Sequence, residues 1–360
     1  MKPRATLYYL ALENDYPVGV DAAFRDIQGH VIHRASKNFV GKAAIEGSAK
    51  LNDGCVLNVA GKVGSEVRWL ITIITILGYR WEGAPMRFFA IAAAVWMLLL
   101  SSYGYATAQS PLDQIGSLAA QSKCAAINWK DRGVAPKAYM RGLAAVFARA
   151  VCQSDRSDVK VVSGARGKPG TSADLTDALT WYDAKFLELG MPNDKDGIDT
   201  LRHTYALMIG LGMQETSGKY CSGRDKSADF STADSAEAGL FQTSWGVHKA
   251  NDTLGGLFDW YSANRAGCLL DVFSQNVQCT AWDAKTWGEG KGADWQKLTK
   301  ACPAFATEYA AVVVRASGGE KGEFGPVRKR KVELRTECDA MLSQVQALAQ
   351  SKPEICAALK

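Results

Sequence analysis

Two short segments of this chain contain the residues most informative about its fold and chemistry: LGMQETSGKY at residues 211–220 and AEAGLFQTSWG at residues 236–246. The first segment ends an apolar helical pattern that begins near Gly197, so we expect Glu215 to lie against packed hydrophobic surface. Burial disfavours the charged form of a carboxyl group and raises its pKa. A carboxylic acid that is protonated near neutral pH is what protonation of a glycosidic oxygen requires.

The 19 residues from 217 to 235, which begin within the first segment and end before the second, are rich in Ser, Gly, Asp and Thr. They predict a long loop, and loops of this length inside a compact domain are usually functional. We expect the loop to form one wall of a substrate cleft, stapled through Cys221. After it, Gly239 to Gln242 brings the chain back in close packing, Gln242 offers an amide for a sugar, and Trp245 offers a ring face for stacking.

The two segments resemble the catalytic core of the lysozyme-like superfamily, especially goose-type lysozymes and soluble lytic transglycosylases. Those families place Glu-Ser at a helix end and Gly-Leu-Met-Gln some twenty residues later; here the matching residues are Glu215-Thr216 and Gly239-Leu240-Phe241-Gln242. The resemblance covers residues 200–246 clearly and residues up to 316 in general character. It implies a mainly α, lysozyme-like helical domain with a substrate cleft. It also implies cleavage of the β-1,4 bond between N-acetylmuramic acid and N-acetylglucosamine, with Glu215 as general acid.

The identity of the attacking group stays open. In a hydrolase a second carboxylate orients water, and Asp234 holds the position that resembles the loop Asp of goose-type lysozymes; Asp225, Asp229 and Glu237 are the other acids of the loop. In a lytic transglycosylase a single Glu suffices, because the 6-hydroxyl of the muramic acid attacks. Goose-type lysozymes also carry an acid just after the Gln, where this chain has Thr243-Ser244. We favour the transglycosylase slightly.

The predicted catalytic residues are therefore Glu215 and Asp234, and the predicted substrate-binding residues are Ser217, Gly239, Gln242 and Trp245. No metal site and no cofactor are expected, because dispersed cysteines without a C-x-x-C pair or a Cys/His cluster are unlike zinc ligands. The expected partner is the glycan strand of peptidoglycan. The alternative is a non-catalytic lysozyme-like module that binds peptidoglycan or has a structural role, and replacement of Glu215 by Gln discriminates between the two.

Residues 86–108 have the pattern of a secretory signal peptide: Met86-Arg87, 13 apolar residues from Phe88 to Leu100, and Ala106-Thr107-Ala108 as a cleavage site. We therefore interpret residues 1–85 as an upstream extension outside the mature protein, with translation starting at Met86; a cytoplasmic segment before a membrane anchor is the alternative. Residues 109–360 are the expected mature domain, with its catalytic core at about 197–316. The expected location is periplasmic or secreted.

Cysteine usage agrees with export. Eight of the nine cysteines follow residue 109, at positions 124, 152, 221, 268, 279, 302, 338 and 356, and Cys55 is the odd one. An even, dispersed set in an exported chain predicts up to four disulfides, with the pairing left open.

Helical periodicity predicts the rest of the body, with helices at 136–152, 173–189 (capped by Ser172), from 197 to the Glu215 region, and at about 248–275, 295–316 and 327–349. Residues 1–68 show no sustained helical or strand period. The formal net charge is +5 for the 360 residues but only +2 for residues 109–360, and this near-neutral body gives no electrostatic argument for nucleic acid. The basic run Arg328–Lys331 is compatible with anionic wall polymer or transient membrane association, although a solvated helix start is the simpler interpretation.

Overall fold

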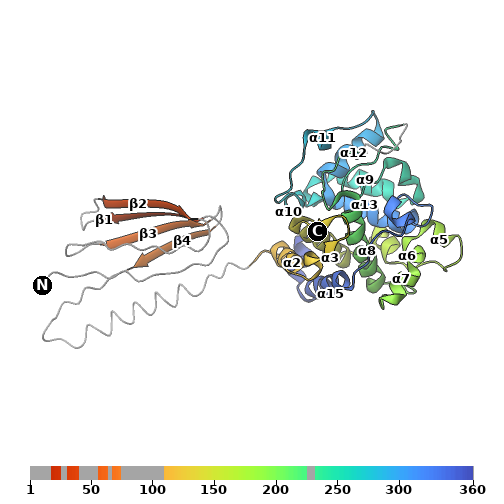
Figure 1. Ribbon diagram of the computed structural model, residues 1–360, viewed down its shortest axis with the longest axis horizontal. Coiled ribbons are helices and arrows are strands. Elements are labelled where there is room, and N and C mark those ends of the chain that lie inside the picture. Colours follow the sequence, from red (N-terminus) through yellow and green to blue (C-terminus); the bar gives the residue numbers. More distant parts are fainter. Residues whose placement is uncertain are drawn as a thin grey trace. The chain divides into compact units, whose positions relative to one another are not determined.

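The computed structural model describes the backbone of four strands within residues 18–73, and residues 109–224 and 232–359 in full (Figure 1). The chain forms two compact units, Met1–Gly104 and Tyr105–Lys360. The signal peptide expected at 86–108, the odd Cys55, and Asp225 and Asp229 of the loop lie outside the described residues.

The N-terminal unit contains an antiparallel sheet. Its strands are β1 (Val18–Arg25), β2 (Val31–Phe39), β3 (Val56–Val63) and β4 (Val67–Ile73), in the order β2-β1-β3-β4. The sequence of residues 1–68 shows no sustained strand period, yet the structure contains three strands and the start of a fourth there. Apolar residues alternate along β1 at Val18, Val20, Ala22 and Phe24, but this pattern is only eight residues long; pairing with β2 and β3 gives the backbone its hydrogen bonds. Whether these residues belong to the mature protein stays a prediction.

The second unit is mainly helical, as predicted. Its first half contains α2 (Pro111–Ala120), η1 (Cys124–Ala126), the short hairpin β5 (Asn128–Trp129) and β6 (Gly133–Val134), α3 (Lys137–Cys152), α4 (Ser157–Ser163), α5 (Ala173–Thr176), α6 (Ala178–Trp181), α7 (Asp183–Glu188) and α8 (Ile198–Thr216). Its second half contains η2 (Trp245–Ala250), α9 (Thr253–Ala263), η3 (Arg265–Cys268), α10 (Leu270–Phe273), α11 (Ala281–Ala284), α12 (Lys291–Ala301), α13 (Pro303–Ala316), α14 (Gly325–Arg328), α15 (Thr336–Ser351) and α16 (Pro353–Ala358).

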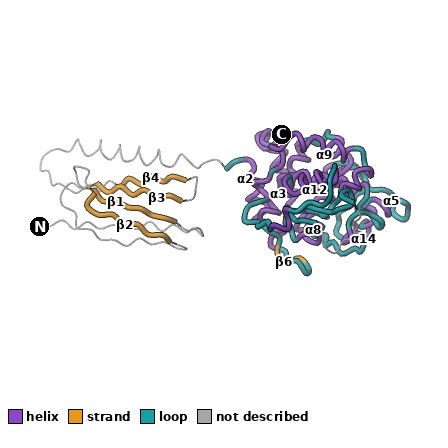
Figure 2. Tube along the Cα trace, turned by 90° about the horizontal axis from the view of Figure 1, so that it is seen from above, coloured by secondary structure: helices purple, strands orange, loops and turns teal. Residues whose placement is uncertain are grey.

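Three mutually contacting helices, α3, α8 and α13, form the centre of this unit (Figure 1). Nearly all residues of α8 from Thr200 to Met213 are buried, and α13 is buried from Pro303 to Val314. Helices that are apolar on all sides belong in the interior, surrounded by others. Figure 2 shows the surrounding helices and the β5–β6 hairpin, which projects from the helical body.

The single helix expected at 173–189 is wrong, because the segment forms the three short helices α5, α6 and α7. The break lies at Asp177, whose carboxylate accepts hydrogen bonds from the Leu179 N–H (3.0 Å) and the Thr180 hydroxyl (2.9 Å). The same carboxylate binds Arg315 of α13 at 2.9 Å. These bonds compete with the helical backbone pattern. The predicted cap Ser172 forms no side-chain cap bond.

Other predicted helices are also divided. The segment 295–316 forms α12 and α13, separated at Cys302-Pro303, because proline lacks the amide hydrogen that helix continuation needs. The segment 327–349 begins as the short α14 and resumes as α15 at Thr336, and the segment 248–275 is divided among η2, α9, η3 and α10. Two expectations are confirmed: a helix at 136–152, seen as α3, and the helix that reaches Glu215, seen as α8.

Four disulfides staple the helical unit, which confirms the expected number and fixes the open pairing. The bonds are Cys124–Cys338, Cys152–Cys356, Cys221–Cys279 and Cys268–Cys302. The first two join the start of the unit to its C-terminal helices over 214 and 204 residues. The third ties the beginning of the long loop to the segment before α11.

Candidate functional site

Glu215 lies in the last turn of α8, where the helix emerges from the core. The residues up to Met213 are buried, while Gln214, Glu215 and Thr216 are half-buried. The buried part of α8 therefore fixes the position of the Glu215 backbone at the edge of the packed interior. The raised pKa expected for its carboxyl group stays a prediction.

Helix α8 ends in a sharp turn immediately after Glu215. Ser217 adopts a left-handed conformation (φ 54°), and the amides of Ser217 and Gly218 donate to the carbonyls of Met213 (3.0 Å) and Gly212 (3.1 Å). These two bonds satisfy carbonyl groups left over at the helix end. A Cβ atom at Gly218 would lie 2.9 Å from Cγ of Tyr139, so only glycine fits there. The backbone of Ser217 thus helps to end the helix. Contact of its side chain with substrate stays a prediction.

The second motif forms a tight turn that contacts the end of α8. Ala238 donates to the Thr243 carbonyl at 3.0 Å, and Gly239, with φ of 80°, packs against Thr299. The Thr216 hydroxyl donates to the Leu240 carbonyl at 2.8 Å. The structure therefore joins the residue after Glu215 to the Gly239–Gln242 turn, although 24 residues separate them in sequence.

Gln242 holds this turn together from within. It is 7% exposed and has a left-handed backbone (φ 46°). Its side-chain amide donates to the carbonyls of Gly223 (3.1 Å) and Gly239 (2.9 Å). Both amide hydrogens are therefore used by the protein, so only the amide oxygen is left for the sugar contact expected from sequence.

Trp245, expected to stack on a sugar ring, is packed as a core residue. Only 5% of it is exposed, and its ring stacks on His248 with centroids 4.1 Å apart and planes at 6°. The ring centroid of Phe258 lies 4.9 Å from that of Trp245, and the Lys291 ammonium lies 5.7 Å from the centroid of the Trp245 ring. A sugar would have to displace one of these neighbours to reach the ring.

Asp234 is exposed, and its backbone positions the loop. Its carbonyl accepts the Gly246 N–H at 2.6 Å. A Cβ atom at Gly292 would lie 2.5 Å from Oδ1 of Asp234, so the start of α12 packs directly on this residue. The structure thus holds Asp234 against Gly246 and Gly292, while Glu237, three residues later, is half-buried.

The segment that follows Glu215 is fixed to the region of α11, a contact that the sequence did not reveal. Besides Cys221–Cys279, Lys219 and Asp283 form an ion pair at 2.5 Å, and the Gly223 N–H donates to Asp283 at 3.2 Å. Burial opposes ionisation of Asp283, but hydrogen bonds from Lys219, Thr280 and Gly223 outweigh it and lower its pKa to about 2. These contacts tie residues 219–223, which follow the end of α8, to the region of α11.

Arg224, the next residue along the chain, places its guanidinium group near two indole rings. Its guanidinium carbon lies 5.5 Å from the ring centroid of Trp282 and 4.8 Å from that of Trp287. Both distances are within the range of cation–π attraction. The tryptophans at 282 and 287 were the available sequence signal, but nothing local to them indicated their proximity to residue 224.

Glu323 is a further acidic residue that the sequence reasoning missed. Its Oε1 accepts a 2.8 Å hydrogen bond from the Ser244 hydroxyl, two residues after Gln242. Burial raises the pKa of the Glu323 carboxyl, although the bonds from Ser244 and the charge of Arg328 oppose the shift. The Tyr309 hydroxyl donates to the Ser244 carbonyl at 3.2 Å. An acid therefore lies beside Ser244, brought from 79 residues further along the chain.

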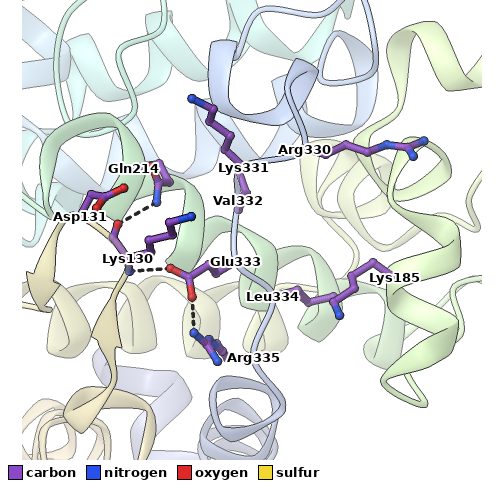
Figure 3. A pocket seen from close by; sticks show the side chains of 10 residues that line it. All are labelled: Lys130, Asp131, Lys185, Gln214, Arg330, Lys331, Val332, Glu333, Leu334 and Arg335. Carbon is purple, nitrogen blue, oxygen red and sulfur yellow. Dashed lines mark hydrogen bonds and ion pairs between the residues drawn. The ribbon is translucent and has the colours of Figure 1, made fainter.

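A cavity of about 500 Å³ opens on another side of the α8 end (Figure 3). Gln214, the residue before Glu215, is one of its lining residues, and its amide lies 3.5 Å from the Lys130 carbonyl. Adjacent residues of a helix point about 100° apart. The cavity therefore lies to one side of the helix end and Glu215 to another.

Comparisons with protein-family models, with curated proteins and with solved structures find no match. Within the described part of the chain, no helix is long and apolar enough to span a bilayer, and no three His, Cys, Asp or Glu residues cluster as metal ligands would.

Proposed function

We propose that this protein is a peptidoglycan-lytic enzyme that cleaves the β-1,4 bond between N-acetylmuramic acid and N-acetylglucosamine, with Glu215 as general acid. The observation that supports this most is the hydrogen bond from Thr216 to Leu240, which joins the two motifs of the lysozyme-like resemblance at the end of a buried helix. A half-buried acid at such a position has the packed surroundings that favour a protonated carboxyl group.

In the reaction we propose, the Glu215 carboxyl donates its proton to the glycosidic oxygen as the bond to the anomeric carbon breaks. In the transglycosylase form, the 6-hydroxyl of the muramic acid then bonds to that carbon and returns its proton to the Glu215 carboxylate. The product is a 1,6-anhydro sugar. This form needs one carboxyl group and so does not depend on Asp234, which is exposed and bonded to Gly246 through its backbone carbonyl alone.

The hydrolase form needs a second carboxylate to orient water. Asp234 is the candidate from sequence, and its fixed backbone beside Gly246 gives it a defined position. Glu323 is less suited as a base, because burial raises its pKa and favours the protonated form. We therefore keep the slight preference for the transglycosylase.

The four disulfides fit a protein of an oxidising compartment, and we propose a periplasmic or secreted location. A second candidate function, a non-catalytic module that binds peptidoglycan, is favoured by the internal use of Gln242 and Trp245. Residues that are packed into the protein contribute less to a substrate cleft.

Mass spectrometry of soluble fragments released from purified peptidoglycan tests the reaction. Anhydro-muropeptides support the transglycosylase. Reducing-end products instead identify a hydrolase, and Asp234→Asn is then expected to abolish their release. No release by the correctly oxidised wild-type protein contradicts the enzymatic proposal and supports the binding module.

A further inference from the structure

The cavity beside Gln214 is strongly basic. Ten residues line it: Lys130, Asp131, Lys185, Gln214, Arg330, Lys331, Val332, Glu333, Leu334 and Arg335 (Figure 3). Five of them are cations and two are acids. Its volume of about 500 Å³ is within the range of ligand-binding pockets.

One of the two acids, Glu333, already has hydrogen-bond and ion-pair partners within the protein. Glu333 accepts the backbone N–H of Lys130 at 2.7 Å and pairs with Arg335, as the dashed lines in Figure 3 show. Within residues 109–224 and 232–359, the ammonium groups of Lys130 and Lys331 have no hydrogen-bond or ion-pair partner. The cavity therefore keeps an excess of positive charge that an anionic ligand would neutralise.

The basic run from Arg328 to Lys331 does not form a flat cationic face. Arg328 donates to the carbonyls of Gly322 and Glu323 at 2.6 and 2.8 Å, and Arg330 stacks on Trp181 with its guanidinium carbon 3.7 Å from the ring centroid. In Figure 3 the Arg330 and Lys331 side chains point to different sides. This divergence disfavours contact with a membrane plane and favours anionic groups that enter a concave site.

The cavity also has an apolar part, because Val332 and Leu334 line it. A suitable ligand therefore combines carboxylates with small apolar groups. The peptide that branches from muramic acid in peptidoglycan has this composition, since it contains alanine methyl groups and several free carboxylates. Gln214 lines the cavity and directly precedes Glu215 in the chain, so the cavity lies at the same end of α8 as the proposed site of cleavage, on another side of the helix.

We propose that this cavity binds the carboxylate-bearing peptide of the peptidoglycan strand and so positions the strand at the end of α8. The inference rests on the proposed function and adds a recognition site for the peptide to a reaction on the sugar chain. Charge-assisted bonds from Lys130 and Lys331 would supply most of the attraction, which predicts a strong dependence on salt.

Titration calorimetry with the free stem tetrapeptide tests the proposal, on the full chain carrying Glu215→Gln. A second peptide with its carboxylates amidated is the ligand control. The test variant carries Lys130→Glu and Lys331→Glu. The matched control carries Lys321→Glu and Lys329→Glu, which makes the same charge change at exposed lysines outside the cavity. Circular dichroism confirms that both variants fold.

We expect the test variant to bind the free peptide at least about tenfold more weakly, the control variant to bind as the parent does, and the amidated peptide to bind weakly. Absence of binding, equal binding of the two peptides, or equal weakening by both variants overturns the inference. Cavity-dependent capture by phosphatidylglycerol vesicles without peptide binding also overturns it and identifies a lipid site. The proposed function is judged separately, because it fails when the wild-type protein releases no fragments from purified peptidoglycan, whatever the peptide does.

Discussion

The Ser244 hydroxyl donates a 2.8 Å hydrogen bond to Oε1 of Glu323 and so brings a half-buried acid next to the Gly239–Gln242 turn. Sequence had indicated only Thr243-Ser244 at this point, where the resembling family has an acidic residue. The pair is best described as a carboxyl group whose pKa is raised by burial, against the opposing hydrogen bonds from Ser244 and the charge of Arg328.

Glu323→Gln tests this description through the pH dependence of stability. A carboxyl group whose pKa is raised on folding stabilises the protein below its ordinary pKa, and this contribution is lost as the pH rises through the folded pKa. We expect urea titrations to show that the variant is as stable as the wild type, or more stable, near pH 8, and has no advantage near pH 4. A variant that loses more stability at the higher pH would contradict this.

Asp283→Asn tests the contacts that tie residues 219–223, which follow Glu215, to the region of α11. The pKa of Asp283 is lowered to about 2, so its ionised form stabilises the fold above its ordinary value of 3.8, and this contribution is lost as the pH falls through about 2. We expect the variant to lose about 1–3 kcal/mol of unfolding free energy near pH 6. The loss should shrink toward pH 3; a constant difference would mean that the ion pair with Lys219 is not its source.

Removal of Cys221–Cys279 by a double Ser substitution should separate the site from general stability. Loss of a disulfide typically lowers the unfolding free energy by about 2–4 kcal/mol. The matched control removes Cys152–Cys356, which joins α3 to α16 and not residues 219–223 to α11. Both variants should melt earlier, but only the first should lower the rate of wall lysis at temperatures where both are folded. Equal rates of lysis for the two variants would contradict a contact between residues 219–223 and the substrate.

Glu308→Leu tests the charge network formed by buried Glu308 of α13 with Arg149 and Arg156. Glu308 is 2% exposed and pairs with Arg149 at 2.9 Å and Arg156 at 2.6 Å. Burial opposes its ionisation, but the two arginines outweigh it and lower its pKa. Removing the carboxylate leaves the Arg149 charge buried, and such changes destabilise proteins by about 3–5 kcal/mol. Urea unfolding measures the loss, with the exposed Glu320→Gln as control; a loss below about 1 kcal/mol would contradict the role of the network.

Long periodic elements could be predicted from the sequence, because burial on one or all sides of α3 and α8 leaves a strong apolar pattern. The break at Asp177 was not predicted: its bonds from Leu179 and Thr180 are local, but its ion pair with Arg315 joins residues 138 apart in sequence. The same reason explains why Glu323, Asp283 and the partner of each cysteine were missed. Their neighbours are created by folding, and no local pattern records them.

For the candidate site, the sequence correctly predicted the helix end at Glu215 and the long loop after it, described here at 217–224 and 232–235. It did not predict that Gln242 and Trp245 would be used for internal packing. A glutamine amide and an indole ring suit a core turn as well as a sugar, and only the contacts with Gly223 and His248 distinguish the two uses.

The most direct test of the central claim is the rate at which the protein releases soluble fragments from purified peptidoglycan, measured for the wild type, Glu215→Gln and the exposed control Glu320→Gln. Glutamine keeps the shape of the side chain but has no acidic proton, and general acid catalysis contributes roughly 10²–10⁴-fold in rate. We predict that Glu215→Gln loses at least about a hundredfold in rate while Glu320→Gln and the disulfide content stay unchanged. Fragment release by Glu215→Gln at the wild-type rate would contradict the assignment of Glu215 as the acid.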